Sequence, residues 1–345
     1  MHRWGWLGKL PAIMNTRFGI LGTGPIVRKY AQACRLLLGL DLVALASRDG
    51  ARARATATEL GIPRAHAGYD TLLADSGVDA VIVALHNGLH CEWTCRALAA
   101  GKHVLCEKPL GCNAGEVAKM FAAAHANRRW LLEGFMYRFH PQMPEIFRRV
   151  RAGEIGRVLH INSHRMSQGR EPGNMRYRRE AGGGALLDIG CYNVSFAQAV
   201  TGTEPVRVQA SAHFDPASGV DLTLTGTLVF ADEVTAQFCC SLESEPSYGA
   251  EIVGTTGRIL IPNPWMPPAW PTDFSVVRAN KSETIRMTPA DAPAHVLTAF
   301  ALQLAQFADC IRRDRAPVYP PGDDAERASL GIARTLDAII ATARV

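Results

Sequence analysis

Gly19-Ile20-Leu21-Gly22-Thr23-Gly24-Pro25-Ile26-Val27 is the stretch that decides the fold of this 345-residue chain. It joins an apolar run suited to a buried parallel strand to a glycine turn and then to a helix start. The two glycines of the turn allow backbone N–H groups to approach a pyrophosphate closely. Proline suits the first helical position, and the helix N-terminus carries a partial positive charge that favours phosphate. The stretch therefore predicts a dinucleotide-binding turn formed by Gly22, Thr23, Gly24, Pro25 and Ile26.

One position departs from the usual G-x-G-x-x-G pattern. Val27 stands in the place of the third glycine, so we expect strand and helix to pack less closely than in the strict fingerprint. Taken alone, the motif also fits a structural strand–turn–helix that binds no ligand. The next strand and a lysine motif further along the chain favour the dinucleotide interpretation.

The end of the next strand indicates which dinucleotide is bound. An apolar run over residues 41–46 ends in Ser47-Arg48-Asp49, about 20 residues after the glycines, where the ribose-binding group is expected. An acidic residue there binds the ribose 2′-hydroxyl and repels a 2′-phosphate, whereas a serine hydroxyl and a guanidinium bind that phosphate. Ser47 and Arg48 therefore favour NADP. NAD is the alternative cofactor, with Asp49 as the ribose-binding group. A second alternative is that these residues bind no ligand and form the solvated, basic start of a helix.

A second motif, Cys106-Glu107-Lys108-Pro109, ends another apolar strand. Ligands bind at the C-terminal edge of parallel sheets, so Lys108 is expected beside the ligand. Hydride transfer between a hydroxyl carbon and nicotinamide needs a group that takes or gives the hydroxyl proton. We expect burial and the cationic nicotinamide to lower the pKa of Lys108 toward the working range. A surface lysine is the alternative for Lys108 taken alone.

Two further side chains complete the predicted catalytic group. Asp188 and Tyr192 are four residues apart in a predicted helix and therefore share one face. Tyr192 is expected to hydrogen-bond the reacting oxygen or relay its proton, and Asp188 to orient the substrate and Lys108. A charge at a helix N-terminus is the alternative for Asp188. Arg176 and Tyr177 are further candidates for contacts with substrate hydroxyls.

Strands and helices alternate along the first part of the chain, which predicts a parallel sheet covered on both faces. The predicted strands are 17–21, 41–46, 79–85, 103–106 and 130–134, and the predicted helices are 25–38, 51–60, 90–100 and 113–127. After residue 157 the pattern changes to alternating strands, which predicts an open, largely antiparallel sheet. Its predicted strands are 158–166, 206–213, 222–230, 235–241, 250–254, 258–261 and 274–277. Residues 180–200 are predicted to form one intervening helix, and residues 323–343 a long amphipathic helix.

The predicted fold class is α/β. An N-terminal extension (1–16) precedes a Rossmann dinucleotide-binding domain (17–135). An α+β domain with the open sheet (136–322) is expected to bind substrate and to form oligomers, and a C-terminal helix (323–345) follows.

Composition excludes several other classes of protein. The net charge of +5 is spread along the chain without a basic block, so nucleic-acid binding is not expected. Nine cysteines form no C-x-x-C pair and have no metal-ligand spacing, which predicts reduced thiols and no metal. No apolar run is long enough to span a membrane, and no signal-peptide pattern opens the sequence. These features predict a cytoplasmic protein.

With these motifs established, the chain resembles the family of glucose–fructose oxidoreductase, inositol dehydrogenase and rhizopine-catabolism proteins (Gfo/Idh/MocA). The family pattern G-I-x-G-x-G-x-I is met at 19–26, E-K-P at 107–109, and the glycine-rich entry to the catalytic helix at 182–192. Tyr192 stands where many members carry histidine. In this it is similar to the branch that contains glucose–fructose oxidoreductase, dihydrodiol dehydrogenase and NADP-dependent xylose dehydrogenase.

The resemblance implies further site residues. The segment 87–90 looks like the family's loop beside the cofactor, so Asn87 and His90 join Glu107 and Lys108 as cofactor-binding candidates, although Glu107 is expected mainly to hold the lysine loop. Arg138 belongs to a segment that resembles one lining the cleft. It is expected either to contact cofactor or substrate, or to form a salt bridge at the domain hinge. Trp265 and Trp270 are expected at a pocket rim or a subunit contact.

The resemblance also implies an NADP-dependent oxidoreductase acting on a sugar, polyol or cyclic diol. Such a protein would be a homodimer or homotetramer that associates through the C-terminal sheet. A non-catalytic NAD(P)-binding sensor is the alternative from another functional class, since the fold supports both.

Overall fold

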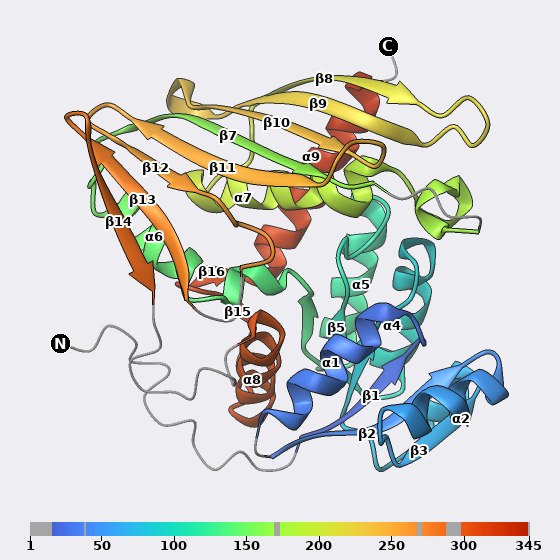
Figure 1. The fold of residues 1–345 in the computed structure, drawn as a ribbon. Coiled ribbons are helices and arrows are strands. Elements are labelled where there is room, and N and C mark those ends of the chain that lie inside the picture. The colour runs from blue at the N-terminus through green and yellow to red at the C-terminus, as the bar shows by residue number, and fades with distance from the viewer. Residues whose placement is uncertain (1–15, 38, 169–172, 268–270, 288–297, 344–345) are drawn as a thin grey trace.

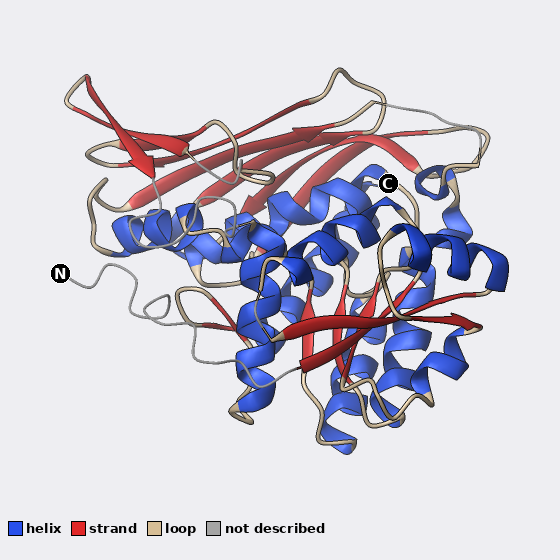
Figure 2. Cartoon of the chain, turned by 60° about the horizontal axis from the view of Figure 1, so that its bottom comes forward, coloured by secondary structure: helices blue, strands red, loops and turns tan. Residues whose placement is uncertain are grey.

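Two sheets with helices between them form the protein (Figures 1 and 2). The structure is a computed structural model that describes residues 16–37, 39–168, 173–267, 271–287 and 298–343. Residues 1–15 of the predicted N-terminal extension and Trp270 lie outside the described residues.

The first sheet has six parallel strands in the order β3-β2-β1-β4-β5-β6. The strands are β1 (Thr16–Leu21), β2 (Leu40–Ser47), β3 (Arg64–Ala67), β4 (Ala80–Val83), β5 (His103–Cys106) and β6 (Leu131–Glu133). The central strands β1 and β4 are almost wholly buried, as continuous apolar runs in a doubly covered parallel sheet should be. The order reverses beside β1, which places a ligand crevice at the C-terminal ends of β1 and β4.

Helices cover both faces of this sheet close to their predicted bounds. They are α1 (Pro25–Arg35), α2 (Gly50–Glu59), α3 (Tyr69–Leu73), α4 (His90–Ala99) and α5 (Ala114–Ala126). The edge strand β3 and the short helix α3 are not predicted from the sequence. β3 reads Arg64-Ala65-His66-Ala67 and is largely exposed, so it lacks the apolar run that marks a buried strand.

The second sheet has eight strands in the order β14-β13-β12-β11-β7-β10-β9-β8. Its strands are β7 (Val158–Met166), β8 (Arg207–Phe214), β9 (Asp221–Val229), β10 (Thr235–Ser241), β11 (Ser247–Gly254), β12 (Arg258–Ile261), β13 (Thr272–Arg278) and β14 (Lys281–Met287). Only the β7–β10 pairing is parallel, so the predicted large, mainly antiparallel sheet is confirmed. The last strand, β14, is not predicted, because its sequence is mostly polar and its side chains are exposed.

The predicted single helix over 180–200 is wrong. The segment instead contains a 3-10 turn (Arg179–Ala181), a π-helical turn (Leu186–Gly190) and α7 (Cys191–Thr201). Gly182 and Gly184 have φ angles of 72° and 114°, a left-handed backbone that a continuous helix does not contain. The glycines therefore end one turn and redirect the chain into the next.

Three more helices link the two sheets. The sequence does not predict α6 (Gln142–Arg151) or α8 (Ala299–Arg312), whereas α9 (Ala325–Ala343) lies within its predicted range. Phe300 at the start of α8 packs edge-on against Tyr30 of α1, with ring centroids 5.3 Å apart. In Figure 1, α9 runs from beneath the large sheet toward the helices of the parallel sheet. None of the described helices is long and apolar enough to cross a membrane.

Candidate active site

The glycine turn after β1 has the shape that a dinucleotide requires. Gly22 has a φ of 117°, and a Cβ there would lie 2.4 Å from the carbonyl oxygen of Ala84. Gly24 is the N-cap of α1, and a Cβ at this position would meet nothing within 4 Å. Open space therefore lies next to the N-terminus of a helix, where the helix dipole favours phosphate, so these residues fit a bound pyrophosphate. Val27 is fully buried.

Between the end of β2 and the start of α2, Asp49 has a different structural role from its neighbours Ser47 and Arg48. The Asp49 carboxylate accepts hydrogen bonds from the backbone N–H groups of Ala51 (2.9 Å) and Arg52 (3.1 Å) and so caps α2. These bonds hold the pKa of Asp49 below its usual value. Ser47 is buried and its hydroxyl accepts from the Asp49 N–H at 3.3 Å, while Arg48 is exposed. Asp49 thus acts in the described structure as a helix cap.

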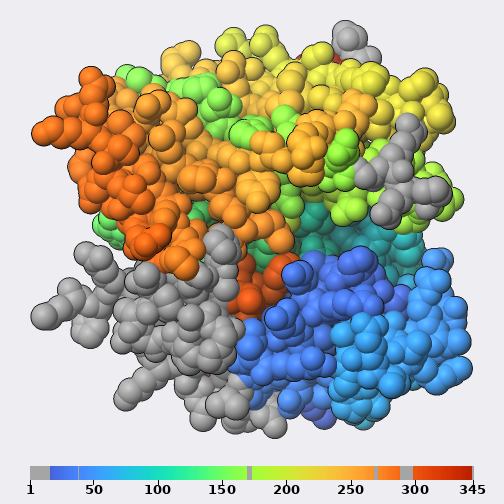
Figure 3. Space-filling model, viewed as in Figure 1, coloured from blue at the N-terminus to red at the C-terminus, as the bar shows by residue number. Residues whose placement is uncertain are grey.

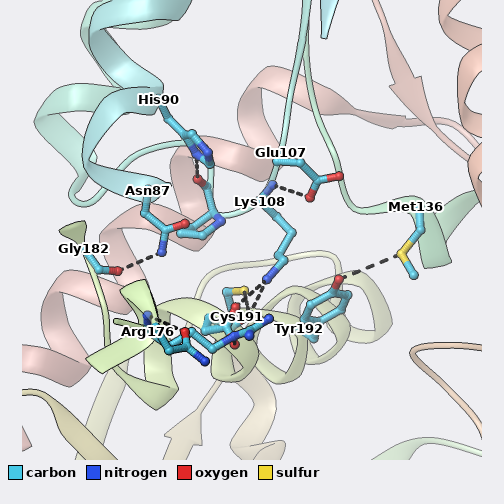
Figure 4. Close-up of polar contacts among 12 residues, drawn as sticks. Asn87, His90, Glu107, Lys108, Met136, Arg176, Gly182, Cys191 and Tyr192 are labelled. Atoms are coloured by element: carbon cyan, nitrogen blue, oxygen red, sulfur yellow. Dashed lines mark hydrogen bonds and ion pairs between the residues drawn. The ribbon is translucent and has the colours of Figure 1, made fainter. Parts of the chain in front are cut away.

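Lys108 and Tyr192 approach each other where the parallel sheet faces the π-helical turn and α7 (Figure 4), and Asp188 pairs with Lys108 there. The Lys108 Nζ donates to the backbone carbonyl of Asp188 and lies 3.3 Å from its Oδ1. It also lies 5.1 Å from the centroid of the Tyr192 ring. Arg176 reaches the other carboxylate oxygen, with its Nε 2.5 Å from Asp188 Oδ2. Two cations therefore share one carboxylate.

The prediction that the pKa of Lys108 is lowered is wrong for this arrangement. Burial does oppose the charge, but the Asp188 carboxylate outweighs it, so the pKa of Lys108 lies above its ordinary value. Burial would likewise raise the pKa of Asp188, yet Lys108 and Arg176 bring it below its usual value. The pair is therefore held as ammonium and carboxylate.

The Tyr192 hydroxyl lies at the buried end of this group. It contacts the sulfur of Met136 at 3.9 Å, and burial raises its pKa although Lys108 and Arg165 oppose this. The Arg165 guanidinium stacks over the Tyr192 ring, with its carbon 3.9 Å from the centroid. Trp265 packs against the same ring at a centroid distance of 6.0 Å. The phenol is therefore kept protonated and fixed in orientation.

Three of the predicted cofactor-loop residues hold the backbone around Lys108. His90 is fully buried, and its ring nitrogens face the carbonyl oxygens of Pro109 (2.8 Å) and Leu85 (3.1 Å). Burial lowers the pKa of His90 to about 4, so the imidazole is neutral. Glu107 accepts from the Tyr30 hydroxyl at 2.7 Å and from the Lys108 N–H at 3.3 Å. Asn87 donates to the Gly182 carbonyl at 2.8 Å, which joins this loop to the entry of the catalytic helix (Figure 4).

Two candidate residues point elsewhere. Arg138 is buried and pairs with Asp323 at 2.6 Å, so the structure supports the salt-bridge interpretation over a cofactor contact. The Tyr177 hydroxyl donates to the Leu242 carbonyl at 2.8 Å and is not part of the described cavity lining around Lys108. Trp265, for which a pocket rim or a subunit contact is expected, is fully buried and lines the cavity around Lys108, and its indole N–H donates to the His164 carbonyl at 3.1 Å.

A cavity of about 310 Å³ opens next to Lys108 and Tyr192. Residues from α1, the lysine loop, β7, the π-helical turn, β11 and α8 line it. They include Ile26, Lys29, Glu107, Lys108, Met136, Arg165, Arg176, Asp188, Tyr192, Tyr248, Trp265 and Phe300. Figure 3 shows a hollow between the orange surface of the large sheet and the blue surface of α1, with red-orange atoms of α8 at its base.

Sequence reasoning missed Arg165, Met136 and the part of α8 at this cavity. Strand alternation places Arg165 on the same face of β7 as the buried residues Ile161 and Ser163. That periodicity was readable from the sequence, but it does not show which residues cover the face. The approach of α8 to α1 depends on tertiary packing and has no local signal.

Comparison with known proteins agrees with this architecture. The family described as "Oxidoreductase family, NAD-binding Rossmann fold" matches residues 16–135, and the "GFO/IDH/MocA C-terminal domain" matches residues 145–260. The D-xylose 1-dehydrogenase (NADP(+)) 2 of Haloferax volcanii is 35% identical over 331 residues, covering 94% of this chain and 97% of that protein. The trans-1,2-dihydrobenzene-1,2-diol dehydrogenase of Homo sapiens is 31% identical over 315 residues, covering 89% and 92%.

A solved structure extends the likeness to three dimensions. The crystal structure of a 3-ketoreductase from Actinomadura kijaniata in complex with NADP and TDP-benzene matches with a TM-score of 0.87. The two sequences are 30% identical, and the match covers 95% of this chain and 98% of that one. Fold and sequence together define an oxidoreductase with an NAD-binding Rossmann fold. The chain belongs to the Gfo/Idh/MocA family, as its motifs predict.

Proposed function

We propose that this protein is an NADP-dependent dehydrogenase or reductase that transfers hydride between nicotinamide and a hydroxyl-bearing carbon of a sugar, polyol or cyclic diol. The observation that carries the proposal is the meeting of Lys108, Asp188 and Tyr192 at a cavity beside the dinucleotide turn. The substrates in the names of the xylose and dihydrodiol dehydrogenases, both relatives over most of the chain, support this substrate class.

The chain's residues would divide the chemistry as follows. When bound, the dinucleotide supplies the hydride acceptor or donor. Lys108, held protonated by Asp188, would give a proton to the carbonyl oxygen during reduction and take it back during oxidation. Tyr192 would hydrogen-bond the same oxygen, and its buried phenol stays protonated at neutral pH. Asp188 and the buried walls would orient the substrate and exclude water.

Cofactor choice is argued from the end of β2. Asp49 caps α2 with its carboxylate, whereas Ser47 and Arg48 can donate to a 2′-phosphate. The NADP named with the Haloferax volcanii relative and bound in the Actinomadura kijaniata structure supports the same choice.

The first prediction concerns this choice. NADPH should bind more tightly than NADH, and Arg48→Ala should weaken NADPH binding about 10- to 100-fold, because a charge-assisted phosphate contact is lost. NADH binding should change little, and Asp49→Asn serves as the matched neighbouring variant. Fluorescence titration with both cofactors measures these affinities. A wild-type preference for NADH that Asp49→Asn abolishes would establish the NAD alternative instead.

The second prediction concerns catalysis. Lys108→Ala should leave NADPH affinity nearly intact while turnover falls about 100-fold or more. Tyr192→Phe removes only the hydroxyl and should slow turnover without loss of stability. The two losses should be non-additive in the double variant, since both groups act on one proton.

A spectrophotometric screen of aldoses, polyols and dihydrodiols with NADP and NAD supplies the substrate for these assays. Normal turnover by Lys108→Ala on its best substrate would remove Lys108 from the mechanism. NADPH binding without turnover of any compound in the panel would favour the non-catalytic sensor.

A further inference from the structure

Arg165 is a cation in the cavity that takes no direct part in the proposed hydride or proton transfer. It lies on β7 and lines the cavity together with Lys108 and Tyr192. Its guanidinium carbon lies 3.9 Å from the centroid of the Tyr192 ring. Its Nη1 is buried and has no hydrogen-bond partner among the described residues.

The charges lining the cavity do not balance. The cations are Lys29, Lys108, Arg165 and Arg176, and the only carboxylates among the described lining residues are Glu107 and Asp188. Asp188 already binds Lys108 and Arg176, and Glu107 binds the Tyr30 hydroxyl and the Lys108 backbone. Neither carboxylate is paired with Arg165.

A buried guanidinium N–H without an acceptor is costly. A cation–π contact with Tyr192 uses none of the guanidinium N–H donors, and Nη1 is left without an acceptor among the described residues. The fork of guanidinium N–H groups matches the two oxygens of a carboxylate or phosphate. The dinucleotide phosphates are expected at the glycine turn and the N-terminus of α1, whereas Arg165 comes from the large sheet and contacts the ring of Tyr192.

We propose that Arg165 selects an anionic substrate, a sugar or polyol derivative whose carboxylate or phosphate group is bound by the edge of this guanidinium. The inference rests on the proposed function, since it places the substrate beside Lys108 and Tyr192. It adds that a neutral sugar of the same size binds less well, because it leaves the Arg165 N–H groups without a charged acceptor.

The test measures binding, so it does not depend on turnover. The NADPH-loaded protein is titrated calorimetrically with D-gluconate, D-glucose 6-phosphate and neutral D-sorbitol at one fixed ionic strength. We expect at least one anion to bind about 10- to 100-fold more tightly than sorbitol. The gluconate and phosphate arms show which group the site takes.

Variants assign the preference to Arg165. Arg165→Met and Arg165→Gln should each abolish the anion preference and leave NADPH affinity unchanged, and Arg165→Lys should keep part of the preference. The matched control is Arg207→Met, which removes the same charge from an exposed position on β8 of the same sheet. The control should retain the full preference.

Equal binding of sorbitol and both anions by the wild type would overturn the proposal, as would a preference that persists in Arg165→Met and Arg165→Gln. Turnover assays with the same compounds separate this outcome from failure of the proposed function. An anion preference that depends on Arg165, without turnover of any sugar derivative, would leave the selectivity standing and refute the catalytic role. Turnover of neutral sugars alone, with no anion preference, would support the catalytic role and refute the anion selectivity.

Discussion

The ion pair between Lys108 and Asp188 sets the protonation state at the reacting end of the cavity. Asp188 raises the pKa of Lys108 against the effect of burial, so the lysine is a proton donor over the neutral range. Asp188→Asn removes the strongest of the interactions that raise the pKa of Lys108, whereas burial, the largest effect and one that lowers it, remains. The fraction of protonated Lys108 should then fall at a lower pH than in the wild type.

The third prediction follows from this lowering of the pKa of Lys108. In Asp188→Asn the alkaline limb of the pH profile of kcat/KM for carbonyl reduction should move to lower pH. Activity at neutral pH should fall roughly 10- to 100-fold, because Lys108 also loses the group that orients it. Arg176→Met is the contrasting variant, since it frees the Asp188 carboxylate for Lys108 and should not move that limb downward. An unchanged alkaline limb in Asp188→Asn would show that Lys108 is not the titrating group.

At the scale of elements, the two glycines after β1 differ in what they do. Gly22 carries the strained turn, where a Cβ would collide with the Ala84 carbonyl, whereas Gly24 has an extended backbone and open space beside it.

The fourth prediction is that Gly24→Ala folds with an unchanged Tm and binds NADPH at least about tenfold more weakly, since its methyl group fills the space through which the phosphate approaches. Gly22→Ala should instead lower the Tm. Thermal denaturation with and without NADPH separates the two effects.

The elements also show how far the sequence predicts this molecule. β7, β10 and β12 have their predicted bounds because alternation of apolar residues is a local property. The edge strands β3 and β14 escape prediction because solvent-facing strands need no apolar pattern. The helix expected over 180–200 is interrupted because Gly182 and Gly184 adopt backbone angles that an apolar periodicity does not report.

The residues of the candidate site likewise fall into those that the sequence predicts and those that it does not. Lys108, Asp188 and Tyr192 come from motifs with fixed spacing, and the structure brings them together. Arg165 and Phe300 reach the cavity only through the packing of β7 and α8, which no short stretch of sequence encodes. The sequence alone does not separate the two roles of Arg138, because a buried arginine and a cofactor-binding arginine have the same local sequence.

At the scale of the whole molecule, Arg138 connects the end of the parallel sheet to the start of α9. Its guanidinium pairs with Asp323, lies 4.7 Å from the Tyr319 ring centroid and 5.5 Å from that of Phe147. Asp323 also binds Arg151 of α6 at 2.8 Å. One carboxylate thereby ties α6 and the segment after β6 to the helix that runs beneath the large sheet.

The fifth prediction tests whether this contact is structural. Arg138→Met leaves Asp323 at the junction without its buried partner, so the free energy of unfolding should fall by about 3 kcal/mol while NADPH affinity stays unchanged. Arg151→Met is the matched control, since it removes the exposed partner of the same carboxylate and should cost less than about 1 kcal/mol. Chemical denaturation gives the stabilities, and fluorescence titration gives the affinities. A stable Arg138→Met protein with weakened NADPH binding would instead assign Arg138 to the cofactor. The burial of its side chain against the Phe147 and Tyr319 rings and its ion pair with Asp323 argue for the first outcome.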